Sequence, residues 1–334
     1  MIKKFVSKST PALGEKLSII NKIVPYIKML RPEISFMDLT LPAAAAMLAA
    51  FCAAGSLPPT LLFLLAVIGG FFAITSSYIF NDCFDVDIDT INLPNRPIPS
   101  GAVSWKQAFI YATALALIAI SISFYLSRES FGVLLIALAV ITLYSVFFKR
   151  TTPFSFVFVG IAYGLVPIGI WLAFDPAGFI VNWKLNAANL NLPIPAILFG
   201  LMICMTDWGF TLAGVSRDLE GDKAKGAPTL PVTYGIPFTS KFILMIWMAG
   251  LLLSLGIGYA AGLGPLYFII ALLSGFWMIG RCLRFIKNPE PELGGKLFIE
   301  GSNYRGIMFS AMIMDILLSI FITSYPSIFN LMGG

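Results

Sequence analysis

Long apolar stretches alternate with short polar ones along most of the chain. We count nine apolar segments, near residues 36–56, 60–80, 105–126, 130–148, 154–174, 194–214, 238–261, 264–281 and 305–325. A helix needs about 20 apolar residues to cross the hydrocarbon core of a bilayer. Backbone groups in lipid must bond within their own segment, and the ten-residue alternation of a β-barrel is missing, so we expect helices. The pattern predicts an all-α, polytopic membrane protein with nine transmembrane helices.

The composition agrees with this and narrows the chemistry. Hydrophobic residues make up 58% of the chain and charged residues 12%, whereas a soluble domain carries about 25% charged residues. An ordinary soluble enzyme and a disordered chain are therefore excluded. His is absent, which removes the commonest general base and transition-metal ligand. The four cysteines show no CxxC spacing and predict no disulfide framework, so the chemistry must use carboxylates, amines, hydroxyls and hard cations.

The basic residues predict the orientation of the helices. With the N-terminus in the cytoplasm, every Lys and Arg except Arg128 and Lys184 falls on the cytoplasmic side, with Arg305 counted there as the first residue of the last segment. This asymmetry follows the positive-inside rule. We therefore expect a multi-pass protein of the cell membrane, with a cytoplasmic N-terminus and an external C-terminus.

The sequence divides into a basic arm, residues 1–31, and a single transmembrane domain, residues 32–334. The arm intersperses basic side chains with apolar ones and lacks the clean apolar stretch of a signal peptide, so we expect no cleaved signal peptide. An interfacial amphipathic helix on an anionic leaflet fits this pattern, and a solvated basic tail fits it equally well.

Two acidic clusters follow the second and sixth apolar segments, so both lie on the cytoplasmic side. In the first cluster, Asn81, Asp85 and Asp89 are four residues apart and line one face of a helix. Asp218 and Asp222 repeat this spacing in the second. Like charges at that spacing repel each other, and a bound hard cation such as Mg²⁺ compensates them. The alternative is a solvated acidic loop paired with nearby Arg and Lys, which explains one such cluster better than it explains two.

Each cluster is followed by rigid turns that carry cations. Arg96 begins the run Arg-Pro-Ile-Pro-Ser-Gly over residues 96–101, and Lys223 lies in a Gly- and Pro-containing run after the second cluster. Cations beside carboxylates indicate an anion held through a metal, and diphosphate fits this arrangement. No P-loop is present, so a nucleotide is disfavoured, and we expect no nucleic-acid partner.

These motifs resemble those of the UbiA-type intramembrane prenyltransferases. The resemblance rests on Asn81-x-x-x-Asp85-x-x-x-Asp89 with the run 96–101, and on Asp218-x-x-x-Asp222 within the run 218–235. It implies nine helices around a central cavity. It also implies transfer of an isoprenoid group from a polyprenyl diphosphate to an acceptor, with Mg²⁺ as cofactor. Arg31-Pro32, and Tyr144 followed by Lys149, are similar to further family elements.

The resemblance and the spacing together assign roles to individual residues. The predicted metal ligands are Asn81, Asp82, Asp85, Asp89, Asp218 and Asp222. The predicted substrate-binding residues are Arg96, Lys149, Lys223, Tyr144 and Arg31. Asp85, Asp89, Asp218 and Asp222 are predicted to be catalytic through their metal, and Asp87 points off the shared face and is expected to be a bystander.

Other polar and aromatic residues within the apolar segments are secondary candidates. Asp207 lies three helical turns before Asp218, so we expect it on the same face, deeper in the membrane, as a base or as a group that orients the acceptor. Asp38 and Asp315 are expected to be structural partners of polar groups. The candidates for stabilising a carbocation through an aromatic face are Phe84, Tyr78, Tyr144 and Tyr163.

Two classes of acceptor fit the sequence. The motif runs are most similar to those of archaeal enzymes that add a geranylgeranyl group to geranylgeranylglyceryl phosphate, and we expect extra cytoplasmic cations to hold that phosphate: Lys149, Arg150, Lys225, Arg281, Arg284 and Lys287. The alternative is an aromatic or tetrapyrrole acceptor. Within the family, a terpene cyclase without a separate acceptor is a further alternative. An ion transporter is disfavoured because the carboxylates gather at one membrane face rather than at the midplane, and a structural scaffold would not need paired carboxylate faces. Membrane lipids are the remaining expected partners.

Overall fold

The computed structural model describes residues 22–181, 183–186 and 191–324. Its long helices are α2 (Ser35–Ala54), α3 (Thr60–Phe84), α5 (Trp105–Leu126), α6 (Arg128–Val146), α7 (Phe156–Phe174), α8 (Ile194–Arg217), α11 (Ile236–Ala261), α12 (Pro265–Lys287) and α13 (Pro291–Ser324). Within the described residues, nine helical segments are long and apolar enough to cross a membrane. The predicted all-α membrane fold is thereby confirmed.

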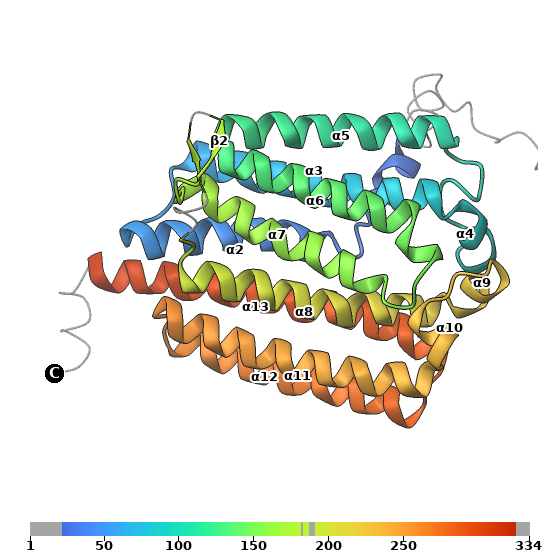
Figure 1. Ribbon diagram of the computed structural model, residues 1–334. Helices are drawn as coiled ribbons and strands as arrows, with labels where there is room; N and C mark the ends of the chain where they lie inside the picture. The colour runs from blue at the N-terminus through green and yellow to red at the C-terminus, as the bar shows by residue number, and fades with distance from the viewer. Residues whose placement is uncertain (1–21, 182, 187–190, 325–334) are drawn as a thin grey trace, which may run out of the picture.

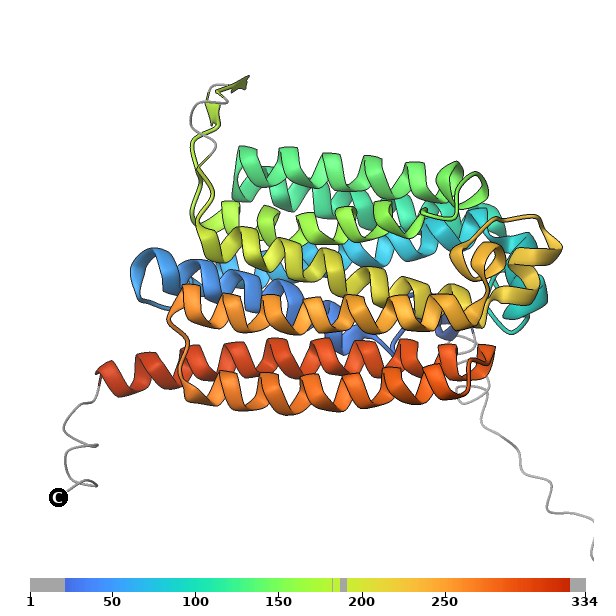
Figure 2. The same ribbon diagram turned by 60° about the horizontal axis from the view of Figure 1, so that its bottom comes forward.

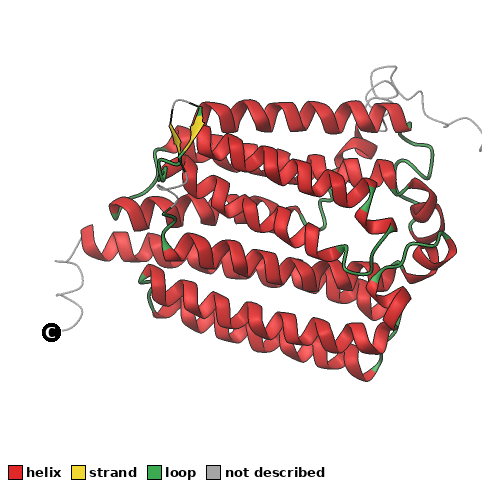
Figure 3. Cartoon of the chain, in the orientation of Figure 1, coloured by secondary structure: helices red, strands yellow, loops and turns green. Residues whose placement is uncertain are grey.

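Short elements join the long helices at both ends of the bundle. At one end lie α4 (Val86–Asn92), η1 (Phe148–Arg150), α9 (Leu219–Ala224) and α10 (Leu230–Tyr234). At the other end, β1 (Ile180–Val181) pairs antiparallel with β2 (Lys184–Leu185) in the connection between α7 and α8. This small hairpin is the one departure from helix and loop that Figure 3 shows for the described residues.

The long helices run side by side and alternate in direction, as Figures 1 and 2 show from two sides. In space α3 packs against α5, α7 against α8, and α13 against both α2 and α8. Ala44, Ala45 and Ala46 of α2 are fully buried, and such small side chains allow helices in a membrane to approach closely. The outer faces carry exposed apolar side chains such as Leu61, Leu252 and Phe276, which suits contact with lipid.

The last helix begins earlier than the sequence pattern places it. The pattern starts the ninth segment at residue 305, whereas α13 begins at Pro291. The prediction that the last span begins at Arg305 is therefore wrong: its side chain lies within α13, is 1% exposed and pairs with Asp207 of α8 at 3.0 Å. A hydropathy count ends an apolar segment at a charged residue, because it cannot detect that the charge is buried beside a partner.

The basic arm falls mostly outside the described residues. Its last part, residues 22–29, is helical. Ile23, Val24 and Ile27 are exposed on this helix, as are Lys22 and Lys28. Exposed apolar and basic side chains on one short helix agree with a position at a membrane surface.

Candidate active site

Both acidic motifs lie where a long helix ends and a short helix begins. The helix α3 ends at Phe84, Asp85 takes a non-helical conformation, and α4 starts at Val86. In the same way α8 ends at Arg217, and Asp218 separates it from α9. The short helices α4 and α9 meet at the same end of the bundle (Figure 1). The two motifs therefore lie together at one end of the bundle, which agrees with the prediction that both are on the same side of the membrane.

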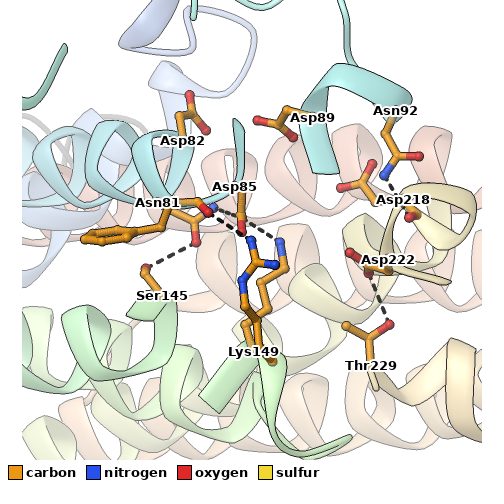
Figure 4. A network of polar contacts seen from close by, with 12 residues as sticks. Asn81, Asp82, Asp85, Asp89, Asn92, Ser145, Lys149, Asp218, Asp222 and Thr229 are labelled. Atoms are coloured by element: carbon orange, nitrogen blue, oxygen red, sulfur yellow. Dashed lines mark hydrogen bonds and ion pairs between the residues drawn. The ribbon is translucent and has the colours of Figure 1, made fainter. Parts of the chain in front are cut away.

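Asn92 joins the two motifs directly. Its side-chain amide donates to the Asp218 carbonyl at 2.8 Å and accepts from the Gly221 N–H at 2.9 Å, and Figure 4 shows it beside Asp218. A Cβ added to Gly221 would lie 2.4 Å from Nδ2 of Asn92. Glycine is therefore needed at position 221 so that the Asn92 amide can reach the backbone of α9.

The carboxylates of the first motif are paired with cations from elsewhere in the chain. Lys149 donates to Asp85 Oδ2 at 2.5 Å, and Asn81 donates to the same oxygen at 2.7 Å (Figure 4). Arg96 donates to Asp89 at 2.6 Å. The first motif is thus held in a network of ion pairs, which agrees with the alternative of an acidic loop paired with Arg and Lys. Its Asp85 and Asp89 are buried, however, so these two carboxylates are not solvated.

Asp82 is joined to Asp89 through Arg96. It accepts from Arg31 at 2.8 Å and from Arg96 at 2.9 Å. Asp87, the predicted bystander, pairs with Arg150 at the surface. Neither of these two carboxylates lines the central cavity described below.

The second motif has a different pattern of charge. Arg217 donates to both oxygens of its neighbour Asp218, at 2.7 and 2.8 Å. Asp222 is fully buried and accepts from the hydroxyl of Thr229 at 3.1 Å (Figure 4), and it forms no ion pair with the described residues. Lys223, a predicted diphosphate ligand, is exposed and lies outside the cavity lining.

Burial and neighbouring charge shift the pKa values of the motif carboxylates. Burial raises the pKa of Asp222 to about 7, although the charge of Lys149 acts against it. Burial likewise raises the pKa of Asp89 to about 6, against the charge of Arg96. Burial acts to raise the pKa of Asp218 as well, but hydrogen bonds and charge from Arg217 outweigh it and hold the pKa below its ordinary value.

The donor set suits a hard cation, although the described carboxylates do not gather around one point. No three carboxylate or cysteine side chains in the described part of the chain converge as a metal site. Each motif nevertheless holds one buried carboxylate oxygen without a hydrogen-bond partner, Oδ1 of Asp85 and Oδ1 of Asp222. A buried, unpaired carboxylate oxygen is unfavourable, and oxygen ligands are those that Mg²⁺ prefers.

A central cavity with about 700 Å³ of unfilled space lies between the motifs and the helices below them. Its polar end is lined by several predicted site residues: Arg31, Asn81, Asp85, Asp89, Arg96, Tyr144, Lys149 and Asp218. Its deeper part is lined by Tyr78, Tyr163, Asp207 and Phe210, so three of the four aromatic candidates reach it and Phe84 does not. Of the extra cations expected for an acceptor phosphate, Lys149 alone is among the lining residues.

An apolar path continues from this cavity between α3, α6 and α7. A smaller hollow shares Ile141 and Tyr163 with the cavity. That hollow in turn shares Ala73 and Ala137 with a third, which holds about 460 Å³ of unfilled space and is lined almost wholly by apolar residues. The site therefore has a charged end at the motifs and an apolar extension toward the opposite end of the bundle.

Asp207 and Asp38 are held in a buried polar group beneath the motifs. Asp207 accepts from Arg305, whose guanidinium also lies 4.3 Å from the centre of the Phe210 ring. Asp38 accepts from the Tyr78 hydroxyl at 3.0 Å. Asp315 instead accepts from the backbone N–H groups of Gly264 and Tyr267 at the start of α12. The expected structural roles of Asp38 and Asp315 agree with these contacts.

Three residues of the site were not singled out from the sequence. Asn92 is three residues beyond Asp89, and Arg217 directly precedes Asp218, so their proximity to the motifs was a usable signal. Arg305 offered no such signal, because Asp207, its partner, is 98 residues away in the sequence.

Comparison with known proteins agrees with this geometry. The UbiA prenyltransferase family matches residues 40–313. Similar relatives include a digeranylgeranylglyceryl phosphate synthase of Thermococcus sibiricus, 31% identical over 81% of this chain and 90% of that protein. A protoheme IX farnesyltransferase of Ruthia magnifica is 28% identical over 78% of this chain and 84% of its own length.

Solved structures show the same fold. An apo UbiA homologue from Aeropyrum pernix K1 superposes with a TM-score of 0.64 at 20% identity, covering 85% of this chain and 98% of that one. A UbiA homologue from Archaeoglobus fulgidus bound to GPP and Mg²⁺ gives a TM-score of 0.53 at 17% identity, covering 86% and 99%. The family match spans most of the transmembrane bundle and both acidic motifs. The chain belongs to the UbiA prenyltransferase family and is an intramembrane prenyltransferase.

Proposed function

We propose that the protein transfers a geranylgeranyl group from geranylgeranyl diphosphate to geranylgeranylglyceryl phosphate, with Mg²⁺, in the synthesis of archaeal ether lipids. The main support for a prenyl diphosphate donor is the cavity, which is charged at the motifs and apolar beyond Tyr163. The similarity to digeranylgeranylglyceryl phosphate synthases supports the choice of acceptor.

The charged end of the cavity provides groups for both the metal and the diphosphate. Asp85 lines the cavity and presents an unpaired buried oxygen, and Asn81, Asp89 and Asp218 line the cavity as well. Asp222 presents a second such oxygen but is not among the lining residues. These five residues are the proposed ligands of Mg²⁺, which when bound would neutralise the diphosphate and act as a Lewis acid. The UbiA homologue solved with GPP and Mg²⁺ supports a metal in such a fold.

The residues of the chain then determine how the donor reacts. Arg96 and Lys149 contact the diphosphate and stabilise the negative charge that grows on it as the allylic C–O bond breaks. The faces of Tyr78, Tyr144 and Tyr163 stabilise the carbocation, while the apolar path between α3, α6 and α7 holds the isoprenoid chain away from water. The acceptor oxygen bonds to the carbocation, and its proton leaves to a carboxylate or to the departing diphosphate.

An aromatic or tetrapyrrole acceptor is the second candidate. The protoheme IX farnesyltransferases among the similar proteins favour it. Both candidates use the same donor chemistry, so they differ only in what enters beside the diphosphate.

A panel of acceptors tests the proposal. The purified protein is reconstituted in lipid and given radiolabelled geranylgeranyl diphosphate with Mg²⁺ or with EDTA. We expect an ether product with geranylgeranylglyceryl phosphate and none with EDTA. Product from hydroxybenzoate or haem, and none from geranylgeranylglyceryl phosphate, would overturn the choice of acceptor. Product formed in the presence of EDTA would contradict the proposed requirement for Mg²⁺.

We also propose that the motif end of the bundle faces the cytoplasm. The support is the distribution of Lys and Arg, which stays lopsided after Arg305 is moved into α13. Single cysteines at positions 95 and 226 are expected to resist a membrane-impermeant thiol reagent in sealed cells and to react after lysis. Labelling of both in sealed cells would reverse the orientation.

A further inference from the structure

The apolar path beyond the central cavity follows one face of α6. From the motif end outward, the residues of this helix that line the cavity and the two hollows include Tyr144, Ile141, Ala137, Leu134 and Ser130. They recur every three or four residues, which places them on a single face. Because a helix rises about 1.5 Å per residue, Ala137 lies about 10 Å along the axis from Tyr144, Leu134 about 15 Å and Ser130 about 21 Å.

Small side chains leave space along this path. Seven of the fifteen residues that line the hollow of about 460 Å³ are Ala or Gly. Some of them serve helix packing, since a Cβ added to Gly69 would lie 2.9 Å from Ile122 of α5. Ala73 of α3 and Ala137 of α6 differ from these, because they line both this hollow and the smaller one of about 300 Å³. A longer side chain at either position would enter the path, so we call these two alanines the neck.

The path ends near the start of α6. Glu129 is 3% exposed and accepts from the backbone N–H groups of Ala177 and Ile180, at 2.7 and 3.1 Å. These contacts fix the connection after α7 against the first turn of α6, one residue before Ser130. The path therefore stops at about the level of Ser130.

The length of an isoprenoid chain can be compared with this face of α6. Extended main chains advance about 3.3–3.6 Å for every three bonds, so a geranyl group spans about 8 Å, a farnesyl group about 12 Å and a geranylgeranyl group about 17 Å. The proposed carbocation forms beside Tyr144. From there an extended geranylgeranyl chain passes the neck and ends between Leu134 and Ser130, whereas a geranyl chain ends before Ala137.

We propose that this face of α6 selects the prenyl donor by its length. The neck of Ala73 and Ala137 admits chains longer than geranyl, and Leu134 contacts the last isoprene unit of a geranylgeranyl chain. This inference rests on the proposed function and names the residues that determine its donor. Each further isoprene unit that fits is buried among apolar side chains, which is favourable. The longest chain that ends before Ser130 is therefore preferred.

Donors of three lengths test the proposal on the full chain in lipid. Ala137→Leu is expected to lower kcat/KM for farnesyl and geranylgeranyl diphosphate about tenfold to a hundredfold, as overpacking does, and to leave kcat/KM for geranyl diphosphate unchanged. Leu134→Phe should reject geranylgeranyl diphosphate alone. Ala139→Leu is the matched control, because Ala139 is exposed on the same helix and lines none of these three spaces. Undiminished use of geranylgeranyl diphosphate by Ala137→Leu would overturn the inference.

A photoreactive donor tests the same assignment without turnover and without any variant. Geranylgeranyl diphosphate that carries a diazirine on its last isoprene unit is expected to label the residues lining the hollow of about 460 Å³, Leu134 among them. Labelling confined to lipid, or to helices that do not border this path, would overturn the inference. If geranylgeranylglyceryl phosphate is not prenylated, the proposed function fails, and the labelling pattern still decides whether the donor chain lies along α6.

Discussion

The two acidic motifs have the same layout and opposite electrostatics. Each begins where a long helix ends, with Asp85 and Asp218 at equivalent breaks. In the first motif the carboxylates are neutralised by cations from distant elements, such as Lys149 beside Asp85. In the second, Arg217 neutralises its own neighbour Asp218, and Asp222 is left with a hydroxyl partner.

This difference indicates that the first motif is positioned by the protein itself, whereas the second is left to react with a ligand. The first motif is fixed by ion pairs that connect α3 and α4 with η1 and with the loop that carries Arg96, so its geometry is maintained before any ligand arrives. The second keeps one buried carboxylate without a cation, and burial raises its pKa to about 7. A metal and a diphosphate add the charge that the second motif lacks.

The largest expected effect is on catalysis and is the same for both motifs. Asp85→Asn and Asp218→Asn keep the shape of the side chain and remove its charge, so packing loss cannot explain the outcome. Because metal-ion catalysis supplies several kcal/mol of transition-state stabilisation, we expect the rate of prenyl transfer to fall on the order of a thousandfold. Near-normal turnover of either variant at saturating Mg²⁺ would contradict the metal role.

The second effect is on stability, and here the motifs should differ. Asp85→Asn leaves the buried Lys149 without its carboxylate, and breaking a buried pair costs about 3–5 kcal/mol. Asp222→Asn removes a buried carboxylate that has no cation, so the stability is expected to change little or to rise. Thermal unfolding of the two variants in the same detergent measures this. Equal losses of stability would show that the motifs are not electrostatically distinct.

The third effect is on the pH dependence of metal binding. Below pH 7 Asp222 is protonated, because burial raises its pKa to about 7, and a protonated carboxyl binds metal poorly. The affinity for Mg²⁺ should therefore fall as the pH drops through 7, by up to about tenfold for each pH unit. The Asp222→Asn variant should show a flatter profile over this range, with metal titrations at pH 6 and 8 as the measurement.

The smallest effect concerns the connection between the motifs. Asn92→Ala leaves the Asp218 carbonyl and the Gly221 N–H without their partner, which costs about 1–3 kcal/mol. We expect a modest loss of stability and a larger loss of kcat, because α4 and α9 are then free to separate. Gly221→Ala should act in the same direction. Asn288→Ala, at an exposed position after α12, serves as the control and should change neither quantity.

Periodicity and spacing predicted the helices and motifs well, because both depend on local sequence. Nine apolar segments are confirmed as helices, and the spacing of Asn81, Asp85 and Asp89 correctly brought their side chains to one cavity. The helix breaks at Asp85 and Asp218 were not foreseen, since neither position carries Gly or Pro. Partners were the hardest to predict: Lys149 with Asp85 and Arg305 with Asp207 are pairs that only the packing of distant helices reveals.

The buried pair of Arg305 and Asp207 has a consequence for how the chain enters the membrane. A lone Arg or Asp at the centre of a helix opposes insertion by about 2.5–3.5 kcal/mol, and α8 carries Asp207 while α13 carries its partner Arg305. The ribosome completes α8 before α13, so Asp207 has no Arg305 to pair with until α13 has been synthesised. A chain truncated before Arg305 would leave a bare carboxylate in lipid. The charge of Asp207 is therefore compensated only once α13 has entered the membrane beside α8.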